Sequence, residues 1–345
     1  SSQKGPEMSH GHAMSPFEYK ESQFFQTFAS VPEPAFDSAE EQARIWGRQW
    51  GCTNDVGRLR AVLMHRPGDE LNIVDPTKKM PEVGGYGDPE QGWYWIGDTL
   101  PDLAAMQTAH DQLTAILKAN GVDVILIDKA APGAMKQIFA RDSCISVRGG
   151  AIVTRLARKV RRGEELPVTQ ALAKAGCPIL GTITGTGVFE GGGFALIDEK
   201  TAVCAVSIAC NAEGVRQLEG ILNYLGIELI KLPMPGYRIH IDGAFNMIDV
   251  DKAIVNTNEL PYFFIDYLKK RGIQLIELPP EDSPFSLNSL AIAPGKLIMH
   301  GSRTKRLEDR LDAAGIELIT CDYEPVEHGG GGIHCSTSPL ARDAI

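Results

Sequence analysis

One pattern recurs five times along the chain: an amphipathic helix, then a glycine, then a short apolar strand. Pairs of apolar runs with turn residues between them, for example 144–155 and 245–256, separate these units and are typical of β-hairpins. Five separate half-buried sheets would leave unprotected edges, whereas a closed ring would not. The sequence therefore predicts an α/β protein, a five-bladed α/β propeller with pseudo-fivefold ββαβ-type repeats. The glycines expected to end the helices are Gly121, Gly176, Gly226, Gly272 and Gly315.

The remaining bulk features limit the partners and the location. A formal charge of −10 disfavours a nucleic acid partner and mildly favours a cationic ligand. No stretch approaches the roughly 20 apolar residues that span a bilayer, and no signal peptide core is present. Seven cysteines without a CxxC pair are typical of a reducing compartment. We therefore expect a cytoplasmic protein without a membrane partner. Residues 1–15 are expected to be a disordered tail or a remnant of an expression sequence.

Five polar residues occupy the same place in successive repeats, just at the start of a hairpin. They are 48, 50, 48 and 47 residues apart. In a closed ring, equivalent positions converge on the central axis, so these side chains are predicted to share one central pocket. The five residues are Asp142, Glu190, His240, Asn288 and Cys335.

Two of these residues suit proton transfer and nucleophilic attack. Cys335 follows four glycines in HGGGGIHCST, where the backbone can come close to a ligand. His240 can exchange a proton near neutral pH, and Asp242, two residues later, points to the same face of a strand. A metal site is the less favoured alternative, because no second His or Cys stands at ligand spacing. Five other cysteines are expected to be buried structural thiols, namely Cys144, Cys177, Cys204, Cys210 and Cys321.

The carboxylates need a positive partner. Asp142 and Glu190 stand at the starts of apolar strands, where an unpaired charge is costly. Arg141 is one candidate partner for Asp142, and a cationic substrate is the other. Three carboxylates beside a thiol suit a planar cation with several N–H donors, held so that its carbon faces the sulfur.

The motifs FARD (139–142), FEGG (189–192), HID (240–242) and GGGIHCST (330–337) resemble those of the guanidino-group modifying enzymes. This superfamily includes arginine deiminases, dimethylarginine hydrolases and glycine amidinotransferases, and it shares the five-bladed pentein fold. The resemblance begins near Val56 and implies that residues 16–345 form a single pentein catalytic domain. It implies that Cys335 attacks the guanidinium carbon and forms a covalent thiouronium intermediate.

The same resemblance assigns the other site residues. His240 would protonate the departing amine and activate water, and Glu190 would complete the catalytic set. No cofactor and no metal would be needed. The substrate-binding residues would be Asp142, Asp242, Arg141, Arg161 and Asn288.

The substrate's tail is less well defined than its guanidinium group. Deiminases grip the carboxylate of arginine with two arginines, and Arg161 resembles the first. The second would fall in SIACNAEG, which offers Ala209 and Cys210 instead. A substrate other than free arginine is therefore open, unless another arginine substitutes. The candidates for that substitution are Arg148, Arg216 and Arg238.

The sequence thus predicts a cysteine-dependent hydrolase that acts on arginine or a related small guanidino cation, in the manner of a deiminase. The alternatives are an amidinotransferase, a dimethylarginine hydrolase and a non-catalytic pentein binding factor. A homo-oligomer stays open. The loop at 84–98, with Trp93, Tyr94 and Trp95, either folds over the pocket or packs on a surface.

Overall fold

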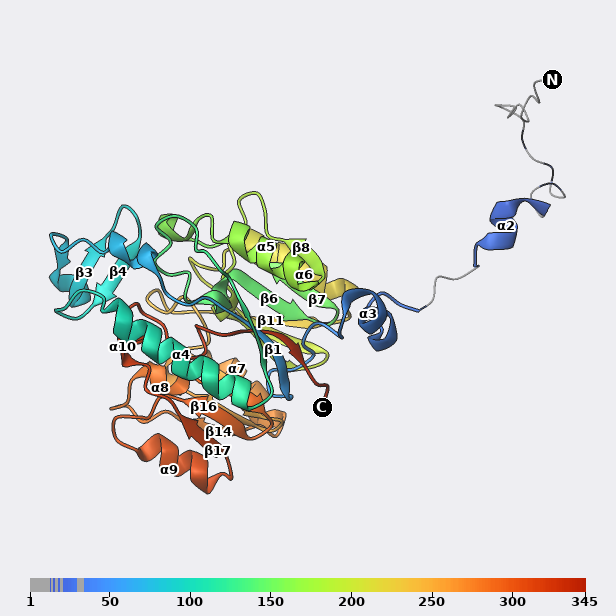
Figure 1. Ribbon diagram of the computed structural model, residues 1–345. Coiled ribbons are helices and arrows are strands. Elements are labelled where there is room, and N and C mark those ends of the chain that lie inside the picture. Colours follow the sequence, from blue (N-terminus) through green and yellow to red (C-terminus); the bar gives the residue numbers. More distant parts are fainter. Residues whose placement is uncertain (1–12, 14, 16–17, 19–20, 30–33) are drawn as a thin grey trace, which may run out of the picture.

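The computed structural model describes residues 13, 15, 18, 21–29 and 34–345 (Figure 1). The prediction for residues 1–15 therefore falls almost entirely outside the described residues. The short helix α2 (Gln23–Thr27) precedes α3 (Ala39–Trp46), whose Gln42 side chain is buried and donates to the carbonyl of Gly149 at 2.7 Å. This contact joins the N-terminal part of the described chain to the sheets.

Five three-stranded sheets share one topology. In each sheet the central strand pairs antiparallel with one neighbour and parallel with the other. The first sheet is β18 (Ser338–Arg342), β1 (Leu59–Met64) and β5 (Asp123–Leu126), and the second is β6 (Cys144–Val147), β7 (Gly150–Val153) and β8 (Ile179–Thr182). The third is β9 (Phe194–Asp198), β10 (Thr201–Val206) and β11 (Glu228–Pro233). The fourth is β12 (Phe245–Asp249), β13 (Lys252–Val255) and β14 (Gln274–Glu277), and the fifth is β15 (Leu290–Ala293), β16 (Lys296–Met299) and β17 (Glu317–Thr320).

A helix precedes the parallel strand of every sheet. Because a parallel pair needs a crossover connection, the repeated helix is what lets the third strand return beside the second. α5 and α6 lie at one end of the molecule in Figure 1 and α9 at the other, with strands between them. The five helices are α4 (Leu103–Ala119), α5 (Glu165–Ala175), α6 (Ala212–Tyr224), α7 (Tyr262–Lys270) and α9 (Arg306–Ala313).

The predicted helix, glycine and strand units are all present. The five glycines expected to end helices have φ angles between 68° and 83°. Gly176, for example, caps α5 in the left-handed region, and its N–H donates to the carbonyls of Leu172 and Ala173. A residue with a Cβ would be strained there, so the glycine fixes the point at which the chain leaves the helix.

The sheets are joined by apolar side chains. Leu222, Phe245, Phe264 and Leu311 belong to one buried cluster that spans the third, fourth and fifth sheets. The first sheet is built from both ends of the described chain, since β18 pairs antiparallel with β1. The α/β class is therefore as predicted.

One sheet lies outside the repeat. β2 (Lys79–Met80), β3 (Gly85–Asp88) and β4 (Trp93–Ile96) form an antiparallel sheet at one side of the molecule (Figure 1). The sequence predicts only a loop at 84–98, whereas the structure has a hairpin there. Two short helices, α8 (Pro284–Leu287) and α10 (Glu324–Glu327), lie near the candidate site in sequence. Among the described residues, no helix has the length and apolar character needed to cross a membrane.

Candidate active site

Most of the predicted site residues lie in the segments that lead into the first strands of the sheets, whereas Arg161 lies in the 3-10 helix η4 (Lys159–Arg161) between β7 and α5. Asp142 lies in the 3-10 helix η3 (Ala140–Ser143) before β6, and Glu190 precedes the 3-10 helix η5 (Gly191–Gly193) and β9. The others lie before β12, β15 and β18. These residues line one cavity of about 180 Å³. The structure therefore brings together Asp142, Glu190, His240, Asp242, Asn288 and Cys335.

The Cys335 thiol is held by two neighbours. Its sulfur lies 3.4 Å from Oδ2 of Asp242 and 3.2 Å from the amide nitrogen of Asn288. The Asn288 oxygen accepts the backbone N–H of Cys335 at 3.1 Å, so this side chain fixes both ends of the residue. Burial, and then the charges of Asp242 and Asp142, raise the pKa of Cys335 well above its usual value. The sulfur is therefore a thiol at neutral pH.

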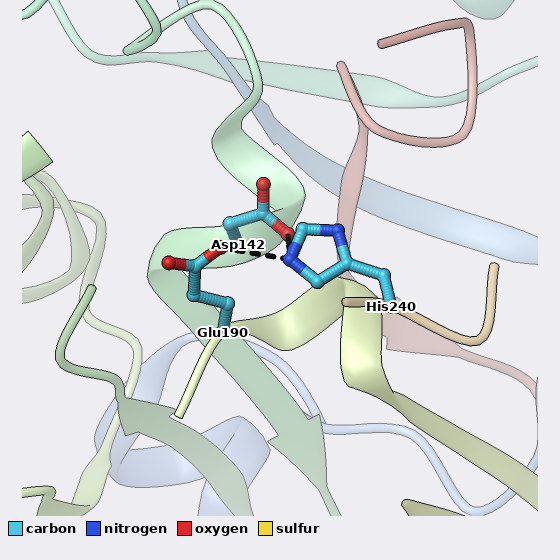
Figure 2. A group of neighbouring side chains, drawn as sticks. All are labelled: Asp142, Glu190 and His240. Carbon is cyan, nitrogen blue, oxygen red and sulfur yellow. Dashed lines mark hydrogen bonds and ion pairs between the residues drawn. The ribbon is translucent and has the colours of Figure 1, made fainter. Parts of the chain in front are cut away.

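His240 faces two of the carboxylates. Its Nε2 lies 2.8 Å from Oε1 of Glu190 and 3.8 Å from Oδ1 of Asp142, and Figure 2 shows both carboxylates turned towards this nitrogen. Burial opposes the charge on the imidazole, but Asp142, Glu190 and Asp242 outweigh it and raise the pKa of His240 to about 9. Burial opposes the charge on Glu190 too, yet His240 lowers the pKa of that carboxyl to about 2. The pair is thus an imidazolium and a carboxylate at neutral pH.

This raised pKa makes a prediction about stability. A histidine with a pKa of 6.5 in the unfolded chain and about 9 in the folded one stabilises the fold fully below pH 6.5, and this contribution disappears as the pH rises through 9. We expect the difference in unfolding free energy between the unaltered protein and His240→Gln to fall by about 2 to 3 kcal/mol between pH 6 and pH 9.5. Urea unfolding at several pH values measures it. A difference that stays constant with pH would contradict the raised pKa.

The same three side chains have ligand-type atoms within 4.8 Å of one another, as a metal site would require. A metal ion binds the neutral imidazole, however, and competes with the proton on its nitrogen. The carboxylates around His240 keep that proton bound up to about pH 9. A metal ion bound by these three side chains would have to displace that proton.

Asp142 is held by a buried ion-pair network. Its Oδ2 accepts from Arg161 at 2.7 Å and its Oδ1 accepts the backbone N–H of Gly192 at 2.9 Å. Arg161 also donates to both oxygens of Glu164 and to two backbone carbonyls. Five N–H groups on a guanidinium leave at most one free for a ligand here. Arg161 lines the cavity, but its bonds orient Asp142, which differs from the predicted grip on a substrate carboxylate.

Arg141 does not line this cavity. Its Nε donates to the carbonyl of His334 at 3.1 Å, and its side chain borders a smaller hollow together with Asp55 and Cys52. The placement does not support a role for Arg141 in substrate binding, and the partner of Asp142 is Arg161. Arg141 and Asp142 are neighbours in η3, but their side chains differ in direction. Only Asp142 lines the cavity.

Two buried residues of the site were not singled out in the sequence. His334 precedes the nucleophile, and its Nδ1 lies 2.9 Å from Oδ2 of Asp242. Lys136 lines the cavity, is 4% exposed, and donates to the carbonyl of Gly329 at 3.1 Å. His334 could have been found from its place in the IHCST motif. Lys136 stands in a loop without a pattern and carries no such signal.

The second arginine of the deiminases has only a partial counterpart in this chain. Ala209 is buried at the position where the resemblance placed it. Arg148 pairs with Asp37 and Arg216 with Glu213, and neither lines the cavity. Arg238 does line it, but its guanidinium pairs with Glu259 at 2.7 Å.

The β3–β4 hairpin reaches the cavity through one side chain. Tyr94 lines the cavity, whereas Trp93 and Trp95 are buried in an apolar cluster. The N–H of Ile96 donates to the carbonyl of His328 at 2.8 Å, which attaches the hairpin to the glycine-rich segment before Cys335. Gly330 has a φ of 96°, and a Cβ there would lie 2.1 Å from the Tyr94 hydroxyl. The hairpin thus folds over the pocket and also packs on the protein.

Solved structures share this fold. A dimethylarginine dimethylaminohydrolase from Pseudomonas aeruginosa, a mutant complexed with citrulline, superimposes with a TM-score of 0.64 at 18% identity and covers 82% of this chain and 99% of its own. SxtG, an amidinotransferase from Microseira wollei in the saxitoxin biosynthetic pathway, superimposes with a TM-score of 0.64 at 16% identity. The match covers 86% of this chain and 98% of SxtG. These likenesses confirm the mixed α/β fold.

Curated relatives are similar over most of their length. The protein YkgA of Bacillus subtilis (strain 168) is 25% identical over 84% of this chain and 95% of its own length. A 2-nitroimidazole nitrohydrolase of Mycobacterium sp. (strain JS330) is 25% identical over 94% of this chain and 90% of its own length. An arginine deiminase of Mycobacterium marinum is 21% identical over 86% of this chain and 98% of its own length.

A family-level comparison covers the segment that carries the site. Residues 102–342 match the family described as "N,N dimethylarginine dimethylhydrolase, eukaryotic". This range contains all the residues that line the cavity except Tyr94. The chain therefore belongs to this family, and with it to the guanidino-group modifying enzymes that the four motifs predicted.

Proposed function

We propose that the protein is a cysteine-dependent hydrolase that removes ammonia from the guanidinium group of a small substrate, in the manner of a deiminase. The observation that carries the proposal is that one cavity is lined both by the Cys335 thiol, 3.4 Å from Asp242, and by His240, which is bonded to Glu190. A nucleophile and a charged acid surrounded by three carboxylates suit a cationic carbon centre.

The first half of the reaction starts when the substrate binds. Asp142, Glu190 and Asp242 hold the guanidinium nitrogens, and the positive charge of the substrate lowers the pKa of the Cys335 thiol. The thiol loses its proton to solvent, because His240 already carries one. The thiolate forms a bond to the guanidinium carbon and gives a tetrahedral intermediate. The C–N bond then breaks as His240 gives its proton to the departing nitrogen, which leaves as ammonia. The product of this half is a thiouronium cation on Cys335.

The second half consumes water. Neutral His240 takes a proton from a water molecule as its oxygen bonds to the thiouronium carbon. The C–S bond breaks, the sulfur leaves as a thiolate, and the added oxygen gives its remaining proton to that thiolate, so that the thiol is regenerated and the substrate leaves as a urea. Glu190 stabilises the imidazolium of His240 in both halves. Asn288, which bonds the sulfur and the backbone N–H of Cys335, is proposed as the residue that positions the nucleophile.

We also propose that the five sheets close into the five-bladed ring predicted from the repeat. Supporting contacts link successive sheets: β18 touches β6, β12 touches β15, and β1 touches β15. The N–H groups of Ile241 and Asp242 donate to the carbonyl of Gly192, which links the third and fourth sheets. The single domain over residues 16–345, the cytoplasmic location and the oligomeric state stay predictions.

A panel of guanidines tests the reaction. We expect the protein to release ammonia and a urea from at least one of arginine, agmatine, a methylated arginine and a guanidino acid, without an added amine. Cys335→Ala is the inactive control, and Cys177→Ala is its match, since Cys177 is a buried thiol that does not line the cavity. Methylamine release would indicate a dimethylarginine hydrolase. Turnover only with an amine acceptor would indicate an amidinotransferase, and both results would contradict a deiminase.

A further inference from the structure

The cavity is lined by both acidic and basic side chains. The acidic residues that line it are Asp142, Glu190 and Asp242. All three are already engaged near the nucleophile and the imidazolium: Asp142 with Arg161, Glu190 with His240, and Asp242 with His334. These three carboxylates suit the guanidinium group of the proposed reaction.

Two basic side chains line the cavity beside Tyr94 of the β3–β4 hairpin. The Lys136 nitrogen lies 3.7 Å from the ring centre of Tyr94, and the guanidinium carbon of Arg158 lies 5.0 Å from it, so one aromatic ring serves both. Within the part of the chain that the structure describes, the Arg158 side chain has no hydrogen-bond or ion-pair partner. Lys136 has only the carbonyl of Gly329. Neither cation faces a carboxylate at hydrogen-bond distance.

The positive charge of Lys136 is only partly compensated. Lys136 is 4% exposed. Burial, and then repulsion from Arg158 and Arg161, lower its pKa well below the usual value, and attraction from Glu190 and Asp142 offsets this only in part. An anion placed between Lys136 and Arg158 would restore the balance, because each could donate charge-assisted hydrogen bonds to it. An ammonium group at the same place would add a third positive charge.

On the basis of the proposed function, we infer that the substrate is an ω-guanidino carboxylate without an α-ammonium group, whose carboxylate binds between Lys136 and Arg158. The geometry distinguishes three tails. A carboxylate matches both cations. The ammonium tail of agmatine is repelled. Arginine offers a matching carboxylate, but its α-ammonium group would lie beside the same two basic groups, and the three acidic residues that line the cavity are assigned to the guanidinium group in the proposed reaction.

Binding to an inactive variant tests the inference without relying on turnover. Calorimetry with Cys335→Ala should show 4-guanidinobutyrate binding at least about tenfold more tightly than butylguanidine, as one charge-assisted bond in a buried site provides. Agmatine should bind more weakly than butylguanidine, and arginine more weakly than 4-guanidinobutyrate. The inference would be overturned if agmatine bound as tightly as butylguanidine or more tightly, or if arginine bound as tightly as 4-guanidinobutyrate or more tightly. Absence of binding by all four compounds would overturn it too.

Variants then assign the preference to residues. In the Cys335→Ala background, Lys136→Met and Arg158→Gln should each lower the ratio of affinities for 4-guanidinobutyrate and butylguanidine about tenfold. Arg216→Gln, a surface arginine paired with Glu213, should leave the ratio unchanged. Arg158 is partly exposed and unpaired, so its variant remains informative if Lys136→Met does not fold. An unchanged ratio in Arg158→Gln would refute the assignment.

Turnover by the unaltered protein separates this inference from the proposed function. A tail preference in binding without ammonia release from any guanidine would keep the anion subsite and refute the proposed reaction. Ammonia release with no preference among the four tails would keep the reaction and refute the subsite.

Discussion

Replacement of Cys335 by alanine is expected to lower turnover of the best guanidine by at least about ten-thousandfold, because no other side chain can form the covalent intermediate. Cys335 is the thiol that lines the cavity. Its removal deletes one sulfur that contacts Asn288 and Asp242, so the fold should persist, with a melting temperature within a few degrees of the unaltered protein. Ammonia assays and thermal unfolding measure the two effects.

Two observations would support the same role for Cys335. A mass increase on the unaltered protein during turnover, mapped to the peptide that contains Cys335, would show the thiouronium adduct. Cys177→Ala should retain activity, because Cys177 lies between α5 and β8, away from the cavity, and contacts the carbonyl of its own neighbour Pro178. Full activity in Cys335→Ala would contradict the proposed chemistry and leave only the family assignment.

Replacement of His240 by glutamine is expected to lower turnover by about a hundredfold to ten-thousandfold, the usual contribution of a positioned acid and base. Because His240 must carry a proton to expel ammonia, activity of the unaltered protein should fall as the pH rises through about 9, the pKa of this imidazole. The variant has no group that titrates at this point, so its alkaline limb should be absent or displaced. Rate measurements from pH 6 to pH 10 test both statements.

His300→Gln is the matched control for this experiment. His300 also pairs with a carboxylate, Glu327, and does not line the cavity. It should keep the activity and the pH profile of the unaltered protein. An alkaline limb that survives unchanged in His240→Gln would assign the limb to another group and remove His240 from the proton transfer.

Much of the fold could be predicted because it repeats. The helix and the glycine that ends it have local signals, and five copies made chance agreement improbable, so the α/β class and all five helix-strand units are confirmed. Convergence of Asp142, Glu190, His240, Asn288 and Cys335 followed from their equivalent places in the repeat. Hydrolase chemistry on guanidine carbon–nitrogen bonds is confirmed at the level of the family.

Features that break the repeat could not be predicted in this way. The β3–β4 hairpin lies outside the five units, and the entry of Tyr94 into the cavity depends on a contact with Gly330, far away in sequence. Lys136 stands in a segment without periodicity. Arg161 was recognised as a site residue, but its partner Glu164 is decided by the burial of both side chains, which pattern analysis does not show.

The pairing of β18 with β1 has a consequence for folding kinetics. Val62 lies opposite Pro339, so this contact joins residues separated by most of the described chain. Each helix-strand unit can form from local contacts, whereas this pairing must close a very long loop and is therefore expected late. Cys335 stands three residues before β18. We expect the nucleophile to reach its partners only in that last step, so that recovery of activity after refolding lags behind recovery of helical signal.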